Sequence, residues 1–326
     1  MSTGFFKKRA VRERWRGVTR WWLPLFAVLA VSCGREKGAG TVSPPEELSP
    51  LETVRSLEAA NSRLDVSLAD TRAYPREIRS ILSRGSVIFA MTAADQKPFF
   101  YQEETTGELI GLDVEIAYEI ANRLGVRAVF NRDAASFDGV VTKVVNKEAD
   151  IALSKLSRTM RRAELVRYTK PYIVFRQALL VNRLEFAKIG PEDQLPGYIK
   201  NFQGSLGVIK NSSYENYAAV NFPAAAIEAF DTWGETVDAL FAGKVLAVYR
   251  DEGEILIVNA IRKDAAMLMK TVFINDQQDP IAMAVNADAP FLQEWLNVFL
   301  EEYLPQKPEE FITARIVRRH FGAGAP

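Results

Sequence analysis

Polar and charged residues follow two short apolar segments of the chain, at residues 154–157 (SKLS) and 250–252 (RDE). Hydroxyl, ammonium, guanidinium and carboxylate groups at the ends of strands can bind a polar or charged small molecule. Each cluster follows a triplet in a strand-like segment, 151–153 (IAL) or 247–249 (AVY), and each triplet begins fourteen residues after an aromatic residue, Phe137 or Trp233. The repeated spacing predicts two similar lobes whose polar strand ends face each other across a cleft, although fourteen residues also fit a short helix and a turn.

The sequence contains no catalytic constellation. Its only histidine, His320, lies in the C-terminal segment 318–321, so no Ser-His pair or His-containing metal site can be assembled with the polar clusters. It also contains no Walker A motif and no glycine-rich dinucleotide fingerprint after a predicted strand. We therefore expect a protein that is not an enzyme and has no catalytic residues, bound metal or cofactor.

The composition is that of a globular protein. Of 326 residues, 48% are hydrophobic and 25% are charged, which is enough apolar material for one large or two medium domains. The net charge of zero hides an asymmetry, because the first 32 residues hold seven Lys and Arg against one Glu, and 34 basic and 40 acidic residues follow. A mildly acidic body argues against nonspecific binding to phosphates, so we expect no nucleic-acid partner.

The first 32 residues are predicted to be an export signal. Basic residues precede the apolar run 21–31, which is too short to cross about 30 Å of hydrocarbon as a helix. Residues 29–34 (LAVSCG) resemble the lipobox of bacterial lipoproteins, in which the cysteine is lipidated and becomes the mature N-terminus. This resemblance implies that Cys33 anchors an exported protein to the membrane, facing the periplasm or the cell exterior. A plain signal peptide with a chance cysteine is the alternative.

Residues 33–75 are predicted to be a tether between the anchor and the body of the protein. Glycine and proline interrupt residues 34–50, which show no apolar periodicity. Between residues 51 and 71 apolar residues recur at roughly helical spacing, which predicts a short extra helix that acts as a spacer.

From about Pro75 the pattern predicts alternating strands and helices in two successive runs. The strands of the first run are predicted at 87–92, 126–130 and 151–153, and its helices at 112–124 and 137–146. The strands of the second run are predicted at 206–209, 227–230 and 245–249, and its helices at 213–221, 232–242 and 251–261. Two βαβαβ runs imply two doubly wound α/β lobes, each a parallel sheet covered by helices.

Several of these segments resemble a known family. The most specific motif is formed by residues 111–116 (GLDVEI), followed by apolar residues at 120, 121 and 124. Further matching segments are 137–139 (FDG), 150–152 (DIA), 157–162 (SRTMRR), 168–172 (YTKPY), 204–214 and 248–252 (VYRDE). On these residues the chain resembles the polar amino-acid binding family of the type II periplasmic solute-binding proteins of ABC importers, over about residues 76–326.

The resemblance implies how the two charges of an amino acid would be bound. Arg162 matches the arginine that binds the ligand carboxylate, and Ser157 with Thr159 opens a short helix whose free N–H groups favour an anion. Asp251 matches the acid that binds the ligand ammonium. Alternatively, Arg162 is a solvated helix residue, and Asp251 is the N-cap of a helix, a role that is compatible with binding.

The second lobe is implied to add hydroxyl donors. Ser212 and Ser213 match a turn that donates hydrogen bonds to the ligand carboxylate, with Asn211 where the family has glycine. Donors on the two lobes would couple ligand capture to closure.

Departures from the family pattern bear on the identity of the ligand. Ala93 stands where several binders of cationic amino acids have an acid, and Gln96 stands where they commonly have an aromatic residue. Lys155 occupies a position where a small residue is usual; it adds a second positive charge to the site or extends to solvent. Phe137 packs on the ligand's carbon chain or belongs to the core. These departures predict a polar or acidic ligand rather than a cationic one.

We therefore expect a monomeric lipoprotein that captures an amino acid or a related small carboxylate and delivers it to the permease subunits of an ABC importer. By resemblance, lobe 1 comprises residues 76–172 and 280–326 and lobe 2 comprises residues 177–275, joined by two crossings near 173–176 and 275–280. Two alternatives stay open: a periplasmic enzyme like the cyclohexadienyl dehydratases, which share this fold, and a lipoprotein that senses an amino acid.

Overall fold

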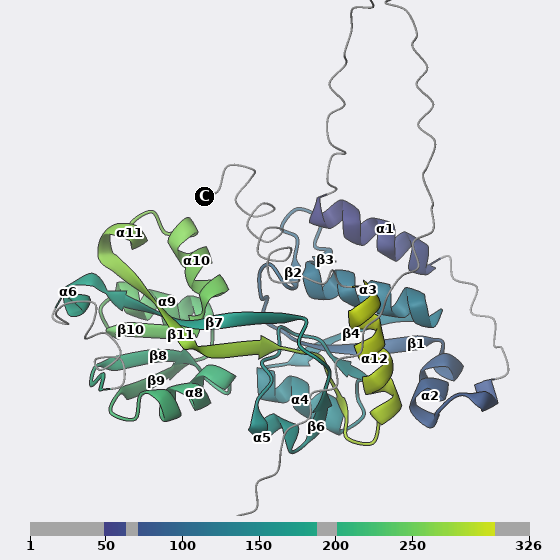
Figure 1. Ribbon diagram of the computed structural model, residues 1–326. Coiled ribbons are helices and arrows are strands. Elements are labelled where there is room, and N and C mark those ends of the chain that lie inside the picture. Colours follow the sequence, from purple (N-terminus) through teal and green to yellow (C-terminus); the bar gives the residue numbers. More distant parts are fainter. Residues whose placement is uncertain (1–48, 63–70, 188–200, 304–326) are drawn as a thin grey trace, which may run out of the picture. The chain divides into compact units, whose positions relative to one another are not determined.

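The computed structural model describes residues 49–62, 71–187 and 201–303 (Figure 1). The predicted export signal, Cys33 and His320 lie outside the described residues. Within them the chain forms two five-stranded sheets, and each sheet with its covering helices forms one lobe.

The first lobe is built on a sheet with the strand order β4-β1-β5-β12-β6. Its strands are β1 (Ser86–Thr92), β4 (Arg127–Ala134), β5 (Ile151–Ala152), β6 (Val166–Tyr168) and β12 (Ala284–Asn286). Its helices are α2 (Arg76–Arg84), α3 (Leu112–Leu124), α4 (Phe137–Val145), α5 (Met160–Ala163) and α12 (Pro290–Tyr303), with the 3-10 turn η1 (Thr71–Ala73) and a ribbon of β2 (Tyr101–Gln102) and β3 (Leu109–Ile110). Alternate residues of β1 lie in two different cores, Phe89 in one and Ala90 in the other, because helices cover both faces of the sheet.

The second lobe has the strand order β11-β7-β10-β8-β9. Its strands are β7 (Ile173–Asn182), β8 (Ser205–Ile209), β9 (Ala226–Phe230), β10 (Ala247–Asp251) and β11 (Met269–Ile281). Its helices are α6 (Arg183–Phe186), α8 (Ser213–Asn221), α9 (Trp233–Phe241), α10 (Glu252–Ile261) and α11 (Ala265–Leu268). The central strand β10 alternates in the same way, since Tyr249 and Val248 belong to opposite cores.

The prediction of two α/β lobes is confirmed, but the prediction of wholly parallel sheets is wrong. In the first sheet β1 is parallel to β4 and β5, whereas β12 is antiparallel to β5 and β6. In the second sheet β8 is parallel to β9 and β10, whereas β7 is antiparallel to β10 and β11. Each of these two strands, β7 and β12, comes directly after the chain has crossed from the other lobe, so it enters its sheet without a preceding crossover helix.

Two antiparallel strands, β7 and β11, carry the chain between the lobes. They pair from Ile173 with Ile281 to Asn182 with Met269. The register shifts within β11, because Ile274 pairs with Gln177 and Gln278 pairs with the adjacent Arg176. Residues 275–277 therefore bulge out of the ladder at the crossing.

Specific residues set the helix ends. Gly111 precedes α3 with φ +124°, and a Cβ there would lie 2.4 Å from the carbonyl oxygen of Phe99. Gly125 ends α3 in the left-handed conformation. Several helices begin with a side-chain cap that accepts the N–H of the third residue into the helix, among them α4 at Ser136, α5 at Thr159, α8 at Ser212, α9 at Thr232 and α10 at Asp251.

Helix α1 (Pro50–Ser62) lies in the segment predicted to be a tether, and it packs on α3 of the first lobe. Its buried Asn61 donates to the carbonyl of Val126 at 2.7 Å and accepts the N–H of Ala128 at 3.0 Å. The amide thus pairs with backbone groups of the edge strand β4, which no other strand covers on that side within the described chain.

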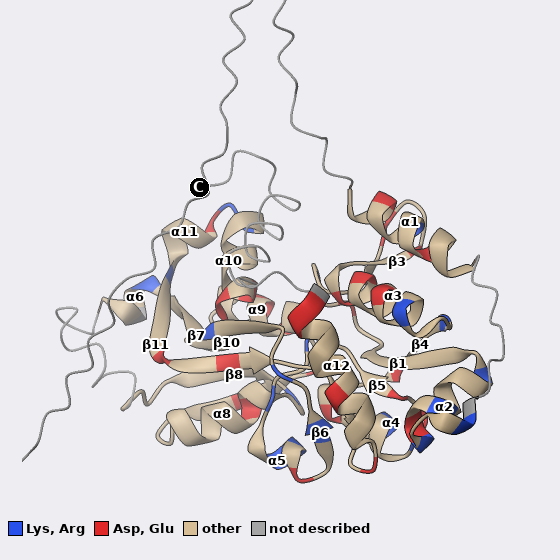
Figure 2. Cartoon of the chain, turned by 45° about the vertical axis from the view of Figure 1, so that its right-hand side comes forward, with Lys and Arg blue, Asp and Glu red and all other residues tan. Residues whose placement is uncertain are grey.

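Basic and acidic residues both occur on α2 and α3 of the first lobe, whereas the charged residues of α8 and α9 in the second lobe are acidic (Figure 2). Among the described residues, no helix combines the length and the hydropathy needed to cross a membrane.

Candidate functional site

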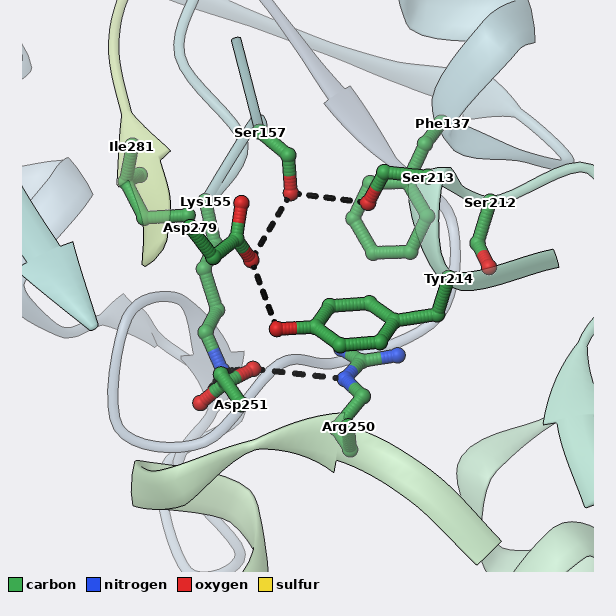
Figure 3. A pocket seen from close by; sticks show the side chains of 10 residues that line it. All are labelled: Phe137, Lys155, Ser157, Ser212, Ser213, Tyr214, Arg250, Asp251, Asp279 and Ile281. Carbon is green, nitrogen blue, oxygen red and sulfur yellow. Dashed lines mark hydrogen bonds and ion pairs between the residues drawn. The ribbon is translucent and has the colours of Figure 1, made fainter. Parts of the chain in front are cut away.

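A small pocket lies between the two lobes, close to where β5 and β10 end (Figure 3). Its lining residues come from both lobes and from β11: Phe137, Lys155, Ser157, Ser212, Ser213, Tyr214, Arg250, Asp251, Asp279 and Ile281. The cavity volume of about 10 Å³ leaves room for about one water molecule. The lobes are therefore in contact, and an amino acid would have to part them to enter.

Hydroxyl groups bridge the lobes at this pocket. Ser213 Oγ donates to Ser157 Oγ at 2.8 Å, and Ser157 Oγ donates to Asp279 Oδ2 at 3.0 Å. Tyr214 donates its hydroxyl to the same Asp279 oxygen at 2.9 Å. Asp279 lies on β11, so one carboxylate of the crossing strand holds a hydroxyl from each lobe.

Asp251 and Lys155 form a buried ion pair across the lobes. Lys155 Nζ lies 3.1 Å and 3.0 Å from the two carboxylate oxygens of Asp251 and 2.6 Å from Glu254 Oε1. It also lies 4.9 Å from the ring centroid of Phe99. Lys155 does not extend to solvent, since the residue is only 4% exposed.

The Asp251 carboxylate both caps α10 and binds an ammonium group, that of Lys155. Asp251 caps α10, because Oδ1 accepts the N–H of Glu254 at 3.1 Å. Burial raises the pKa of Asp251, but the charges of Lys155 and Arg250 outweigh it, so the pKa lies below the usual range. A carboxylate that stays ionised is the form that binds an ammonium group.

The backbone of Lys155 adopts the left-handed conformation, with φ 47°. Its N–H donates to Asp113 Oδ2 at 2.7 Å, and the hydroxyl of Tyr172 donates to Asp113 Oδ1 at 2.9 Å. Burial raises the pKa of Asp113 to about 7 despite these hydrogen bonds. Asp113, the second residue of α3, therefore positions Lys155 at the end of β5.

Arg162 lies beside the pocket and does not line it. Its Nε donates to Asp138 Oδ1 at 2.8 Å, and its Nη1 donates to the carbonyl of Ser157 at 3.1 Å. Nη2 is 2.8 Å from the same Asp138 oxygen but lacks hydrogen-bond geometry, and it has no other partner among the described residues. The guanidinium is buried and held by its own lobe.

The remaining predicted site residues divide between two spaces. Phe137, Ser212 and Ser213 line the small pocket; Ser212 also donates to the carbonyl of Ile209 at 2.6 Å while it caps α8. Gln96 instead lines an adjoining outer cavity of about 210 Å³, which Phe137 also borders. The structure therefore brings all the predicted residues except Gln96 and Arg162 to the small pocket.

Arg250, Tyr214 and Asp279 line the pocket but were not predicted as site residues. Burial and the negative charge of Asp251 raise the pKa of Asp279 to about 6. Arg250 belongs to the predicted strand-end cluster, where Asp251 alone matched the family motif. Aromatic residues at equivalent places in the two runs, Phe137 and Trp233, were a further signal, because both rings flank the Arg250 guanidinium at 5.6 Å.

The described residues contain no group of three or more His, Cys, Asp or Glu side chains that could hold a metal ion. The side chains that line the pocket include buried cations, carboxylates and hydroxyls. Such groups can bind a small molecule that carries charges of both signs.

Relatives of this chain are named as amino-acid-binding proteins. An arginine-binding periplasmic protein of Mannheimia haemolytica is 23% identical over 155 residues, which cover 47% of this chain and 59% of that protein. The chain thus spans less than two thirds of that relative. The L-cystine-binding protein TcyA of Bacillus subtilis is 23% identical over 270 residues, covering 83% of this chain and 94% of TcyA.

The fold is shared with solved structures. An ancestral amino acid-binding protein, AncCDT-1, described as a precursor of cyclohexadienyl dehydratase, superposes with a TM-score of 0.59 at 23% identity, over 75% of this chain and 98% of that one. Two α/β lobes with two crossing strands are the architecture of the type II periplasmic binding proteins. Residues 88–307 match the family model as well, and the chain belongs to the bacterial extracellular solute-binding proteins, family 3.

Proposed function

We propose that this protein captures an amino acid between its two lobes outside the cytoplasm and delivers it to an ABC importer. Family membership supports the class of protein, and relatives named for arginine and for cystine support an α-amino acid as the ligand class. Within this proposal Asp251 binds the ligand ammonium, while Arg162 and the hydroxyls of Ser157 and Ser213 bind its carboxylate.

The observation that carries the proposal is the ammonium group of Lys155 on Asp251. A primary ammonium lies against this carboxylate, against Glu254 and over the ring of Phe99. The side chains of Lys155 and Asp251 are each only 2% exposed. A ligand ammonium has the same charge and the same donors. It can therefore replace Lys155 Nζ when the lobes part, at little cost in solvation.

Binding can be tested by thermal unfolding of the exported domain with single amino acids. A ligand at about 100 times its Kd is expected to stabilise the protein by about 2.7 kcal/mol. Calorimetry with Asp251→Asn, which retains the α10 cap acceptor, should then show at least about a tenfold weaker Kd. No stabilisation by any amino acid would contradict the proposal.

We also propose that Cys33 carries the lipid anchor. Cys33→Ser should leave ligand affinity unchanged and move the protein from the membrane fraction to the soluble exported fraction, because a thioether-linked lipid supplies the attachment. Membrane fractionation measures this directly. A Ser variant that stays membrane-bound through residues 21–31 would contradict lipid anchoring and leave amino-acid capture untouched.

A second candidate function is an elimination reaction in the same cleft. Asp279, with a pKa raised to about 6, supplies a buried acid near Asp251 that can hold a proton at mildly acidic pH. The fold similarity to a protein described as a dehydratase precursor is compatible with this function. Incubation with prephenate distinguishes the two, because an enzyme would release water and carbon dioxide and a binder would not.

A further inference from the structure

Arg250 links the lining of the small pocket to a residue that lines the outer cavity. It lines the pocket, while its Nη2 donates to Gln96 Oε1, which lines the outer cavity, at 3.1 Å. Phe137 borders both spaces, and its ring lies 5.6 Å from the guanidinium carbon. Arg250 thus lies at the junction of the two spaces and is only 3% exposed.

Three aromatic rings surround this guanidinium. Its central carbon lies 5.6 Å from the ring centroids of Phe137 and Trp233 and 5.8 Å from that of Tyr214. Figure 3 shows the guanidinium close to the Tyr214 ring. The faces of aromatic rings attract cations, so these three residues form an aromatic box. The cation in this box is the protein's own Arg250 guanidinium.

Two nitrogens of Arg250 retain hydrogens to donate. Nε and Nη1 are buried and have no hydrogen-bond partner among the described residues. Asp251 and Glu254 are near, at 3.4 Å from Nε and 3.8 Å from Nη2, but these distances reflect ion pairing only. Lys155 differs, because it donates to both carboxylates and lies over Phe99. Of the two cations that line the pocket, Arg250 is the one with two donor nitrogens, Nε and Nη1, that lack acceptors among the described residues.

Buried donors without acceptors cost free energy until an oxygen reaches them. The two acids already beside Arg250 offset its charge, so a ligand oxygen need not be ionised to bind. An incoming ammonium or guanidinium, by contrast, brings no acceptor and meets a like charge in the aromatic box. The box is therefore unsuited to a cationic side chain and suited to a carboxylate or amide oxygen.

We propose that Arg250 determines ligand specificity: it excludes cationic amino acids and binds the terminal oxygen of a side chain such as that of glutamate, aspartate, glutamine or asparagine. Nε and Nη1 donate to that oxygen. The unpaired Oδ1 of Asp279 in the same pocket accepts a donor from the ligand. The inference rests on the proposed capture of an amino acid, and it names the class of side chain.

Calorimetry with the intact exported domain tests the proposal. The wild type should bind glutamate, aspartate, glutamine or asparagine at least about tenfold more tightly than arginine or lysine. Arg250→Ala removes the internal guanidinium from the box and should shift the ratio of arginine to glutamate affinity at least about tenfold toward arginine. Arg250→Gln, which keeps a polar group beside Gln96, should lose glutamate affinity and serves if Arg250→Ala does not fold.

Arg262→Ala is the matched control. Arg262 lies on the same lobe, pairs with Asp238 and stacks on Phe241 at 4.8 Å, but it does not line the pocket. Its substitution should leave the order of ligand affinities unchanged. A similar change of preference in Arg262→Ala and Arg250→Ala would overturn the assignment to Arg250.

The outcomes separate this inference from the proposed function. A wild type that prefers arginine, lysine or an apolar amino acid overturns the role of Arg250 and leaves amino-acid capture standing. Binding of succinate or 2-oxoglutarate but of no amino acid, with weaker binding in both Arg250 variants, upholds the role of Arg250 and overturns amino-acid capture. Binding of neither class overturns both.

Discussion

The ends of β5 and β10 are equivalent places in the two lobes, yet they present their cations differently. Lys155 follows β5 in a left-handed backbone conformation, and carboxylates of the other lobe bind its ammonium group. Arg250 lies within β10 in extended backbone, and its contacts across the cleft are with Gln96 and Phe137. Each lobe thus completes the surroundings of the other lobe's cation, so parting the lobes exposes both charges at once.

The largest expected effect comes from removing the carboxylate that faces both cations. Asp251→Ala leaves Lys155 with Glu254 alone and removes the cap of α10, so we expect the free energy of unfolding to fall by about 3 to 5 kcal/mol. Urea unfolding followed by circular dichroism measures it. Adding Lys155→Met should restore part of the loss, because it removes the uncompensated charge. A loss below about 1 kcal/mol would show that the buried pair is not maintained in solution.

The next effect is a pH dependence of stability, which has opposite signs for Asp279 and Asp251. The pKa of Asp279 is raised from 3.8 to about 6, so its contribution to stability is fully present below pH 3.8 and is lost as pH rises through 6. Asp279→Asn should therefore stabilise the protein by up to about 3 kcal/mol at pH 7.5, and the gain should disappear near pH 4. The lowered pKa of Asp251 has the opposite sign, since its stabilisation is present at neutral pH and is lost at acidic pH. Unfolding curves across this range test both, and an equal gain from Asp279→Asn at pH 4 and 7.5 would refute the titration.

A smaller difference in stability measures the strain of the left-handed backbone at Lys155. Lys155→Gly and Lys155→Ala both lose the ion pair, but glycine adopts φ 47° without the steric cost that alanine bears. The glycine variant should therefore be more stable than the alanine variant by about 1 kcal/mol. Melting temperatures of the two variants give the difference. If alanine were equally stable, Asp113 would not be holding a strained backbone in place.

The smallest effects compare equivalent helix starts. Ser136→Ala and Thr232→Ala each remove the side-chain cap of α4 and α9, at a cost of about 1 kcal/mol. Thr232→Ala should cost slightly more, because Glu235 also accepts the N–H of Thr232 in a capping box. Chemical unfolding of the two variants measures the free energy of unfolding that each cap contributes. A larger loss from Ser136→Ala than from Thr232→Ala would reverse the expected order.

Periodicity in the sequence was enough to predict five helices, α3, α4, α8, α9 and α10, and the parallel strands β1, β4, β5, β8, β9 and β10. Helices α2 and α12 were not predicted. Helix 112–124 was predicted to the residue, because apolar residues recur every three or four positions and Gly125 stops the pattern. Strand β12, by contrast, was not predicted. Its three residues are too few to show alternation, and its pairing depends on a chain that returns from the other lobe.

The site was predictable only in part, for a physical reason. Sequence motifs indicate which residues lie at strand ends, and they led to Asp251, Ser157 and Ser213 at the pocket. They do not indicate which charges are already neutralised by the protein. That depends on contacts 96 residues apart for Lys155 with Asp251 and 154 residues apart for Arg250 with Gln96. The contrast between a satisfied lysine and an unsatisfied arginine therefore required the three-dimensional structure.

The bulge at residues 275–277 makes the two crossing strands mechanically unequal. β7 passes between the lobes without an extra residue, so its length is fixed at about 3.3 Å per residue, whereas β11 holds three residues of slack. Arg176, beside this slack on β7, is tied to the start of α10 through Glu252 at 2.6 Å. A rotation that parts the lobes would thus turn about β7, and the extra residues of β11 would extend to allow it. The three extra residues lie just ahead of Asp279, so the irregular part of β11 adjoins the carboxylate that holds a hydroxyl of each lobe.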